Sequence, residues 1–182
     1  MGSLSTHTPF QWLRDLERRA KQRAKGLPRQ EKIQQYWRGI AFRIADVSLV
    51  SSLVDIREIL PCPTHLARVP GAKPWIKGIA NIRGQLLPVI DLQGCLVASM
   101  IATDSKKRLL IINQAGISAG LLVDEVLGIK HFPEHLHEHN SPCKEAWMTP
   151  FAKGLFAHEG QTWTVFDMHT LAESDTFLKA AL

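Results

Sequence analysis

The stretch Asn81-Ile82-Arg83-Gly84-Gln85-Leu86-Leu87-Pro88-Val89-Ile90-Asp91-Leu92 carries the clearest structural signal in the chain. Asn81 and Gly84 favour a tight turn, because these residue types tolerate the unusual backbone angles of a reversal. The apolar run from Leu86 to Leu92 predicts a buried strand, with Pro88 at an edge or a bulge. The segment therefore predicts a β-hairpin with Arg83 at its exposed tip. A purely structural hairpin explains the apolar residues and the glycine, but it does not explain an arginine at this position.

Short aliphatic and β-branched runs continue on both sides of this hairpin, from Arg38 to the C-terminal region. Clusters with Gly, Asp, Asn or Pro separate them at intervals of about eight to twelve residues, which is typical of an all-β protein. Strands are expected at 39–44, 47–54, 56–60, 79–82, 86–91, 108–113, 117–124, 126–131, 153–157 and 162–166. Tight turns are expected at Ala45-Asp46, Arg83-Gly84, Gln114-Ala115-Gly116 and Glu159-Gly160. Ten strands are too many for one simple barrel of this size, so two small barrels that share an interface are expected, followed by a closing helix over 168–181.

The N-terminal region has a different pattern and a different charge. Its apolar residues recur at spacings of three and four, which predicts one stripe of an α-helix: Phe10, Leu13, Leu16, Ala20, Ala24 and Leu27. Gly26 and Pro28 predict its end, and residues 29–37 predict a second, shorter helix. Residues 1–43 carry ten Lys and Arg against three acidic residues, a net charge of +7, whereas the remaining 139 residues have a net charge of −2. The basicity of the chain therefore belongs to an N-terminal extension.

Composition and motifs exclude several classes of protein. The chain has 182 residues, 45% of them hydrophobic and 21% charged, which is typical of a globular fold. No apolar run approaches the roughly 18 residues of a membrane-spanning helix, and the first residues do not resemble a signal peptide, so a cytoplasmic protein is expected. The three cysteines, Cys62, Cys95 and Cys143, fit neither a disulfide framework nor a zinc site. Phosphate-binding glycine motifs and the nucleophile elbow of hydrolases do not occur.

Four of the eight histidines fall within residues 131–139. On a strand, His135, His137 and His139 would lie on one side, where imidazoles could bind zinc or nickel. Pro133 disfavours regular structure, and neither a cysteine nor the His-Glu-x-x-His motif completes a ligand set. A solvated connecting loop that is dispensable for function is expected instead, with no metal and no cofactor.

The hairpin motif resembles the signature of the CheW-like family, which includes chemotaxis coupling proteins and the matching regulatory domain of CheA-type histidine kinases. Segments 53–60 and 120–128 fit the same family pattern in the same order, and 153–156 and 163–167 resemble the last two strands of the family. Segments 9–13, 26–28 and 128–133 resemble in particular the CheW-like proteins of type IV pilus twitching-motility signalling. The resemblance covers roughly residues 37–172.

The resemblance implies an all-β, CheW-like fold of two five-stranded barrels in residues 37–182, preceded by a basic helical extension in residues 1–36. It also implies a non-enzymatic adaptor between a CheA-type kinase and a methyl-accepting chemoreceptor, located in the cytoplasm at inner-membrane receptor arrays and reaching the membrane only through them. The expected partner-binding residues are Ile56, Arg57, Glu58 and Ile59 on the kinase-facing strand, and Asn81, Arg83 and Gly84 near the groove for the receptor's helical tip. Ile56 or Ile59 could equally belong to the barrel core. Asp91 and Asp124 are expected to be structural, as hydrogen-bond acceptors at strand ends.

The sequence is compatible with more than one role for the N-terminal helix and with a second function of the body. The N-terminal helix could pack on the body, dock on a partner or touch an acidic membrane surface. The alternative function is a single-stranded nucleic-acid binder, since small β-barrels often have that role. The net charge of −2 on the body and the absence of an aromatic platform in its motifs argue against nucleic acid.

Overall fold

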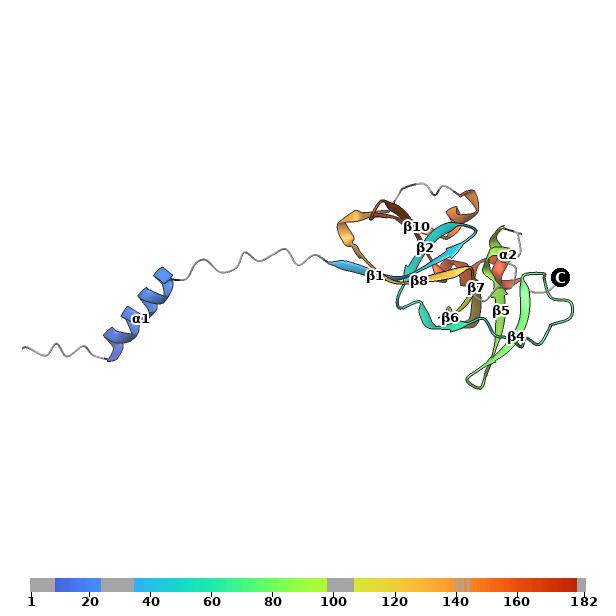
Figure 1. The fold of residues 1–182 in the computed structure, drawn as a ribbon, viewed down its shortest axis with the longest axis horizontal. Helices are drawn as coiled ribbons and strands as arrows, with labels where there is room; N and C mark the ends of the chain where they lie inside the picture. The colour runs from blue at the N-terminus through green and yellow to red at the C-terminus, as the bar shows by residue number, and fades with distance from the viewer. Residues whose placement is uncertain are drawn as a thin grey trace, which may run out of the picture. The chain divides into compact units, whose positions relative to one another are not determined.

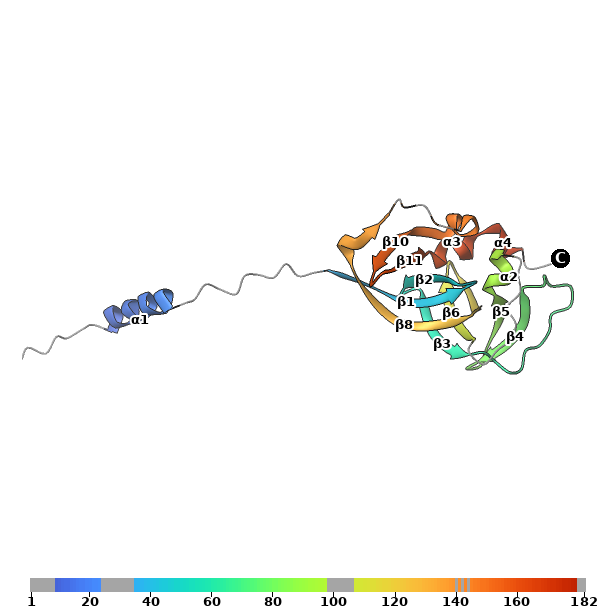
Figure 2. The ribbon, with the colours of Figure 1, turned by 45° about the horizontal axis from the view of Figure 1, so that its top comes forward.

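A computed structural model describes residues 9–23, 35–97, 107–139, 141, 143 and 145–179. The chain divides into two units, Met1–Gln34 and Gln35–Leu182, which we call the extension and the body. The described part of the extension is helix α1 (Pro9–Arg23), and the body consists of two β-sheets with short helices (Figures 1 and 2). Among the described residues, no helix has both the length and the hydropathy needed to cross a bilayer.

Two mixed sheets make up the body. Sheet A has the order β8-β1-β2-β11-β10-β9, from β1 (Tyr36–Ile44), β2 (Val47–Ser52), β8 (Glu125–Pro133), β9 (His137–Glu138), β10 (Ala152–His158) and β11 (Gln161–Phe166). Sheet B has the order β3-β6-β7-β5-β4, from β3 (Ile56–Pro61), β4 (Ile76–Ile82), β5 (Gln85–Asp91), β6 (Arg108–Gln114) and β7 (Ile117–Val123). Neighbouring strands are antiparallel except β2 with β11 and β5 with β7. All ten expected strands are present, and the two-residue strand β9 is additional.

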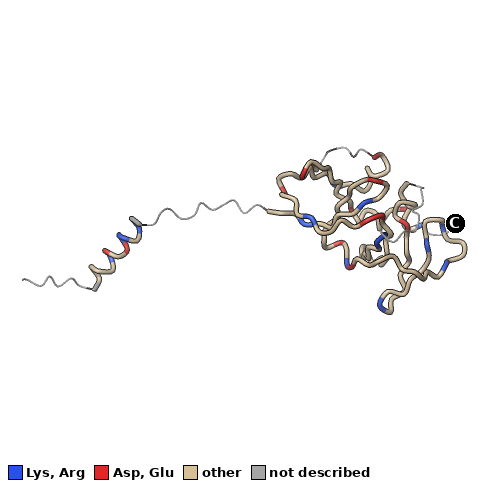
Figure 3. The backbone as a smooth tube through the Cα atoms, in the orientation of Figure 1, with Lys and Arg blue, Asp and Glu red and all other residues tan. Residues whose placement is uncertain are grey.

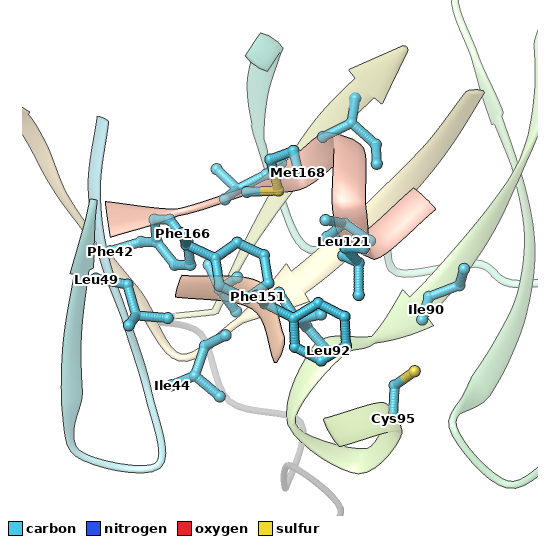
Figure 4. Packing of buried hydrophobic residues seen from close by; sticks show 14 of the residues in the cluster. Phe42, Ile44, Leu49, Ile90, Leu92, Cys95, Leu121, Phe151, Phe166 and Met168 are labelled. Carbon is cyan, nitrogen blue, oxygen red and sulfur yellow. The ribbon is translucent and has the colours of Figure 1, made fainter. Parts of the chain in front are cut away.

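The apolar runs of the central strands supply three separate clusters of buried side chains. Because successive side chains on a strand point to opposite faces, one run can line two cores. The cluster shared by the two sheets includes Phe42 of sheet A and Leu121 of sheet B (Figure 4). On β6, Leu110 and Ile112 belong to this shared cluster, whereas Leu109 and Ile111 belong to a cluster within sheet B. A third cluster lies within sheet A and includes Phe132, Phe156 and Trp163. This arrangement agrees with two barrel-like sheets that share an interface.

Four of the hairpins have the same turn chemistry, as expected. Each has two central residues with positive φ, the arrangement of a type I′ turn, which matches the twist of the flanking strands. The φ angles are 48° and 66° at Ala45-Asp46, 51° and 83° at Arg83-Gly84, 52° and 78° at Ala115-Gly116, and 53° and 73° at Glu159-Gly160. Glycine occupies the second position in three of the four turns, where it adopts positive φ without steric cost.

Two buried or half-buried aspartates fasten strand ends, which confirms their predicted structural role. Asp91 is completely buried, and its Oδ1 accepts the Gly94 N–H at 2.9 Å in the first turn of α2 (Leu92–Val97), while Lys77 lies 3.0 Å away. Asp124 lies where the chain passes from sheet B back to sheet A. Its Oδ2 accepts the Ala45 N–H at 2.9 Å, its backbone N–H donates to the Arg43 carbonyl at 3.1 Å, and its other carboxylate oxygen pairs with Lys107.

Two helix predictions are wrong. The single closing helix is divided into α3 (Met168–Glu173) and α4 (Asp175–Leu178), because Ser174 adopts an extended conformation and its hydroxyl accepts the Phe177 N–H as an N-cap. The second N-terminal helix does not reach its expected end, since Tyr36 and Trp37 lie on β1, paired with β8. The remainder of that segment, and the expected end of the first helix at Gly26 and Pro28, lie outside the described residues.

The histidine segment also differs from the expected solvated loop. Residues 134–136 form a short 3₁₀ helix (η1, Glu134–Leu136), and His137 lies on β9, paired with Phe156 of β10. The His137 ring stacks on Phe156 with centroids 4.6 Å apart and contacts His139 at 3.9 Å. Burial lowers the pKa of His137, His139 lowers it further, and a hydrogen bond with the Lys153 backbone opposes both effects. His137 is therefore a packing residue at the edge of sheet A.

The extension should be dispensable for the stability of the body. The first strand begins at Tyr36, so deletion of residues 1–34 leaves both sheets complete. We expect the truncated chain to differ from the full chain by no more than about 0.5 kcal/mol in the free energy of unfolding, as a surface change does. Thermal melts of the two proteins measure this. An insoluble or clearly destabilised truncation would show that Phe10, Leu13 and Leu16 belong to the core of the body.

His137 should make stability depend on pH. Because the folded chain binds a proton at His137 less tightly than the unfolded chain, the free energy of unfolding should decrease as the pH falls through and below the ordinary histidine value of 6.5. His137→Phe keeps the ring stack and removes the titration, so it should reduce this loss, whereas His137→Ser should cost about 1 kcal/mol at pH 8. Urea titrations between pH 5 and 8 check both results, with the exposed His135→Ser as the matched control. Equal pH profiles for wild type and His137→Phe would refute the assignment.

Candidate partner-binding surface

Sheet B brings two of the predicted binding residues together across its edges. Strands β3 and β4 are the outer strands of this sheet, so neither is the other's neighbour in the hydrogen-bonded order. Nevertheless Glu58 of β3 forms an ion pair with Arg83, at the tip of the β4–β5 hairpin. The two edges therefore approach each other, and the ion pair bridges the seam between them.

The turn holds Arg83 outward. The Asn81 Oδ1 accepts the Gly84 N–H at 2.9 Å, which stabilises the reversal, and Arg83 itself has a φ of 51°. Its side chain is 77% exposed, whereas that of Glu58 is only 23% exposed. A guanidinium has five N–H donors in a planar fork, so pairing with one carboxylate oxygen leaves donors that face solvent.

The four residues expected on β3 divide between core and surface. Ile56 is 7% exposed and belongs to the cluster shared by the sheets, so its side chain is a core residue and no surface anchor. The pairing register shifts between Ile56 and Glu58, a bulge that places Arg57 outside the regular ladder, where it is exposed. Ile59 is 37% exposed and lies on the opposite face of β3 from Glu58.

One apolar residue beside the turn differs in exposure from the sequence-based prediction. Leu86 was expected to be buried with the rest of its run, but it is 72% exposed. It lies opposite Asn81, next to the turn, where the hairpin extends beyond the rest of the sheet (Figure 1). Only the register could have identified this exposure, since the residue type favours burial. We call Glu58, Asn81, Arg83 and Leu86 together the hairpin surface.

The segment between β3 and β4 adds apolar area next to the hairpin surface. Ala67 and Ile79 exchange two backbone hydrogen bonds of 2.8 and 2.9 Å, which hold this segment against β4. A groove beside the pair is lined by Thr64, His65, Leu66, Ala67, Ile79, Asn81 and Leu86. A neighbouring hollow of about 280 Å³ is almost entirely apolar, lined by Val69, Pro70, Gly71, Ala72, Ile76, Ile79 and Pro88. An exposed arginine beside apolar grooves is suited to protein recognition.

The cysteines and the charged residues of the body bear on the alternatives to protein recognition. Burial raises the pKa of Cys62 and Cys143, and it raises the pKa of Cys95 to about 11, so these thiols remain protonated at neutral pH and are poor nucleophiles. Within the ranges that the structure describes, no three His, Cys, Asp or Glu side chains come close enough together to hold a metal ion. Acidic and basic positions are both scattered along the backbone of the body (Figure 3), and residues 44–182 have a net charge of −2, which gives no support to the nucleic-acid alternative.

Comparison with known proteins agrees with the architecture and the motifs. The model of the CheW-like domain matches residues 38–176, which is most of the body. Protein PilI of Pseudomonas aeruginosa is 40% identical over 175 residues, covering 96% of this chain and 97% of PilI. A chemotaxis protein CheW of Rhizobium meliloti is 24% identical over 136 residues, covering 75% of this chain and 87% of that protein.

A solved structure shows the same fold. The crystal structure of the scaffolding protein TtCheW from Thermoanaerobacter tengcongensis superposes with a TM-score of 0.68 at 24% sequence identity, covering 78% of this chain and 96% of that one. The family resemblance of the hairpin motif is therefore confirmed by the sequence match and by the fold. The chain belongs to the CheW-like family.

Proposed function

We propose that this chain is a non-enzymatic adaptor that couples a methyl-accepting chemoreceptor to a CheA-type histidine kinase, in the signalling system of type IV pilus twitching motility. Membership of the CheW-like family supports the adaptor role, since its curated relatives include chemotaxis proteins. Similarity to PilI along nearly the whole chain supports the pilus system. The adaptor works in the cytoplasm, at receptor arrays on the inner membrane, and its body carries both partner sites.

The observation that carries the proposal is the exposed Arg83–Glu58 pair beside Leu86. Reversible contacts between proteins combine a few apolar anchors with charges that select the partner and fix its orientation. Arg83 offers hydrogen-bond donors that face solvent, and Leu86 offers a large apolar side chain that is 72% exposed. An ion pair this exposed contributes little to folding, so its placement is better explained by recognition than by stability.

The residues on β3 receive separate roles in this proposal. Arg57 and Ile59 are exposed and contact the kinase, whereas Ile56 acts indirectly by fixing the position of the strand from the core. Asn81 and Gly84 hold the turn, and Arg83 contacts the receptor tip. Glu58 orients Arg83 through the ion pair, so it links the edge that faces the kinase to the edge that faces the receptor.

Arg83→Ala should separate binding from stability. Loss of an exposed ion pair should change the free energy of unfolding by about 0.5 kcal/mol or less. Loss of an interface anchor should cost on the order of 2 kcal/mol of binding, roughly thirtyfold in affinity for the receptor tip or the kinase. Arg83→Lys should restore only part of it, because an ammonium cannot reproduce the planar fork. Thermal melts and binding titrations on the same preparations measure both quantities.

Arg38→Ala is the matched control, since Arg38 is exposed on β1 of sheet A, away from the hairpin. It should change neither quantity. Glu58→Gln removes the negative charge that pairs with Arg83, and it should lower the affinity for the receptor tip or the kinase less than Arg83→Ala does. An Arg83→Ala protein that melts much earlier but binds normally would contradict the interface role. An adaptor must bind two partners, a CheA-type kinase and a chemoreceptor tip from the same genome. If the purified full chain does not bind one of them, the proposed function itself is overturned.

A further inference from the structure

Helix α1 has no part in the function proposed for the body. It lies outside the residues 38–176 that match the CheW-like domain, yet the match to PilI spans 175 of the 182 residues and therefore includes it. The helix has 15 residues and is about 22 Å long. A helix of this length needs contacts on its apolar face to persist in water, so its side chains indicate what it contacts.

One face of α1 consists of large apolar side chains that are exposed. At about 100° per residue, Trp12, Leu13 and Leu16 fall within roughly 100° of the helix circumference, and Phe10 lies about 60° beyond Leu13. Their exposed fractions are 65% for Trp12, 63% for Leu13, 47% for Leu16 and 69% for Phe10. Four exposed residues of this size within two turns form an apolar patch that soluble proteins generally cover.

The rest of the circumference is basic. The helix has five Lys and Arg against two acidic residues, a net charge of +3, and both signs are visible along α1 in Figure 3. Each acidic residue is paired four positions along the helix, Asp15 with Arg19 at 3.1 Å and Glu17 with Lys21 at 2.6 Å. Because Asp15 and Glu17 are paired with Arg19 and Lys21, three of the five cations remain as excess positive charge, and two of these, Arg14 and Arg18, lie on the side opposite Leu16.

We propose that α1 lies flat on an anionic lipid surface, with Trp12, Leu13 and Leu16 at the boundary of the acyl chains and Arg14 and Arg18 among the headgroups. A helix with low overall hydropathy, Trp, Phe and Leu on one face and Arg and Lys on the other has the chemistry of an interfacial helix. Tryptophan prefers the headgroup region, where its amphipathic ring is partly hydrated. The cations are attracted to phosphate headgroups, so anionic lipid is the complementary partner.

A direct lipid contact of α1 adds to the indirect membrane association expected from the receptor array. The apolar patch is small, so binding should be reversible and should need the basic residues as a second contribution. The sequence after α1 continues this charge with Lys25, Arg29 and Lys32 against a single acidic residue, Glu31. The lipid contact of α1 is independent of the partners of the body, since neither a kinase nor a receptor takes part in it.

The test is co-sedimentation of the full-length chain with vesicles of phosphatidylcholine containing 30% phosphatidylglycerol, compared with pure phosphatidylcholine. We expect at least tenfold stronger binding to the anionic vesicles, and weaker binding as NaCl is raised from 50 to 500 mM. Arg14→Gln with Arg18→Gln should weaken binding by roughly fivefold for each charge removed. Leu13→Ala with Leu16→Ala should weaken it at least tenfold, and because alanine favours helix, loss of the helix would not explain the result.

Val54→Ala is the matched control, because Val54 is an apolar residue of the body that is 87% exposed. It should bind anionic vesicles like the wild type. Equal binding to both kinds of vesicle, or full binding by the Leu13/Leu16 variant, would overturn the proposal. Absence of vesicle binding by the wild type, together with loss of kinase or receptor binding in the Leu13/Leu16 variant, would also overturn it and would assign α1 to a protein partner. Normal vesicle binding by a chain that binds no kinase would refute the adaptor function alone.

Discussion

The body depends on strands that bury both of their faces. Leu109 to Ile112 on β6 alternate between the core within sheet B and the core that the two sheets share, and none of the four is more than 4% exposed. Neither sheet could keep this arrangement alone, since separation would expose one face of every such strand to water. Close packing on both sides also explains Gly120, where a Cβ would come within 2.9 Å of the Leu109 side chain. The tandem fold is therefore one cooperative unit, although it contains two sheets.

Each sheet closes its edges in a different way, and the proposed binding surface lies at one of the two closures. In sheet A the outer strands β8 and β9 are joined by the three residues of η1, so the chain itself spans the seam. In sheet B the outer strands are remote in sequence, and side chains meet there instead, Glu58 with Arg83. The charges of a bound protein can compete for the Glu58–Arg83 ion pair, because Arg83 is exposed. They cannot separate β8 from β9, because the chain itself connects these two strands. The recognition that we propose for Arg83 thus lies where a sheet is closed by side chains alone.

The sequence predicts the parts of this fold that depend on local chemistry. The I′ turns and the strands between them follow from residue type, and Asp91 and Asp124 at strand ends behave as expected. The division of β3 into a buried Ile56 and a half-exposed Ile59 does not follow, because a bulge shifts the register and only tertiary pairing reveals it. The exposure of Leu86 is missed for a related reason, since an apolar side chain near a hairpin tip has no core within reach. His137 is misassigned because its stacking partner, Phe156, is distant in sequence.

The order of the strands has a consequence for synthesis on the ribosome. All five strands of sheet B lie between β2 and β8, so this sheet is an insertion within sheet A, which the chain leaves before Ile56 and rejoins at Asp124. The parallel pairing of β2 with β11 joins Leu49 to Thr164, near the two ends of the body. When sheet B has left the ribosome with all of its strands, β1 and β2 can pair with each other, but their outer neighbours β8 and β11 have not yet been made. Sheet B can therefore pair all of its strands before sheet A is complete, but the face that it shares with sheet A stays exposed until β8, β10 and β11 have emerged.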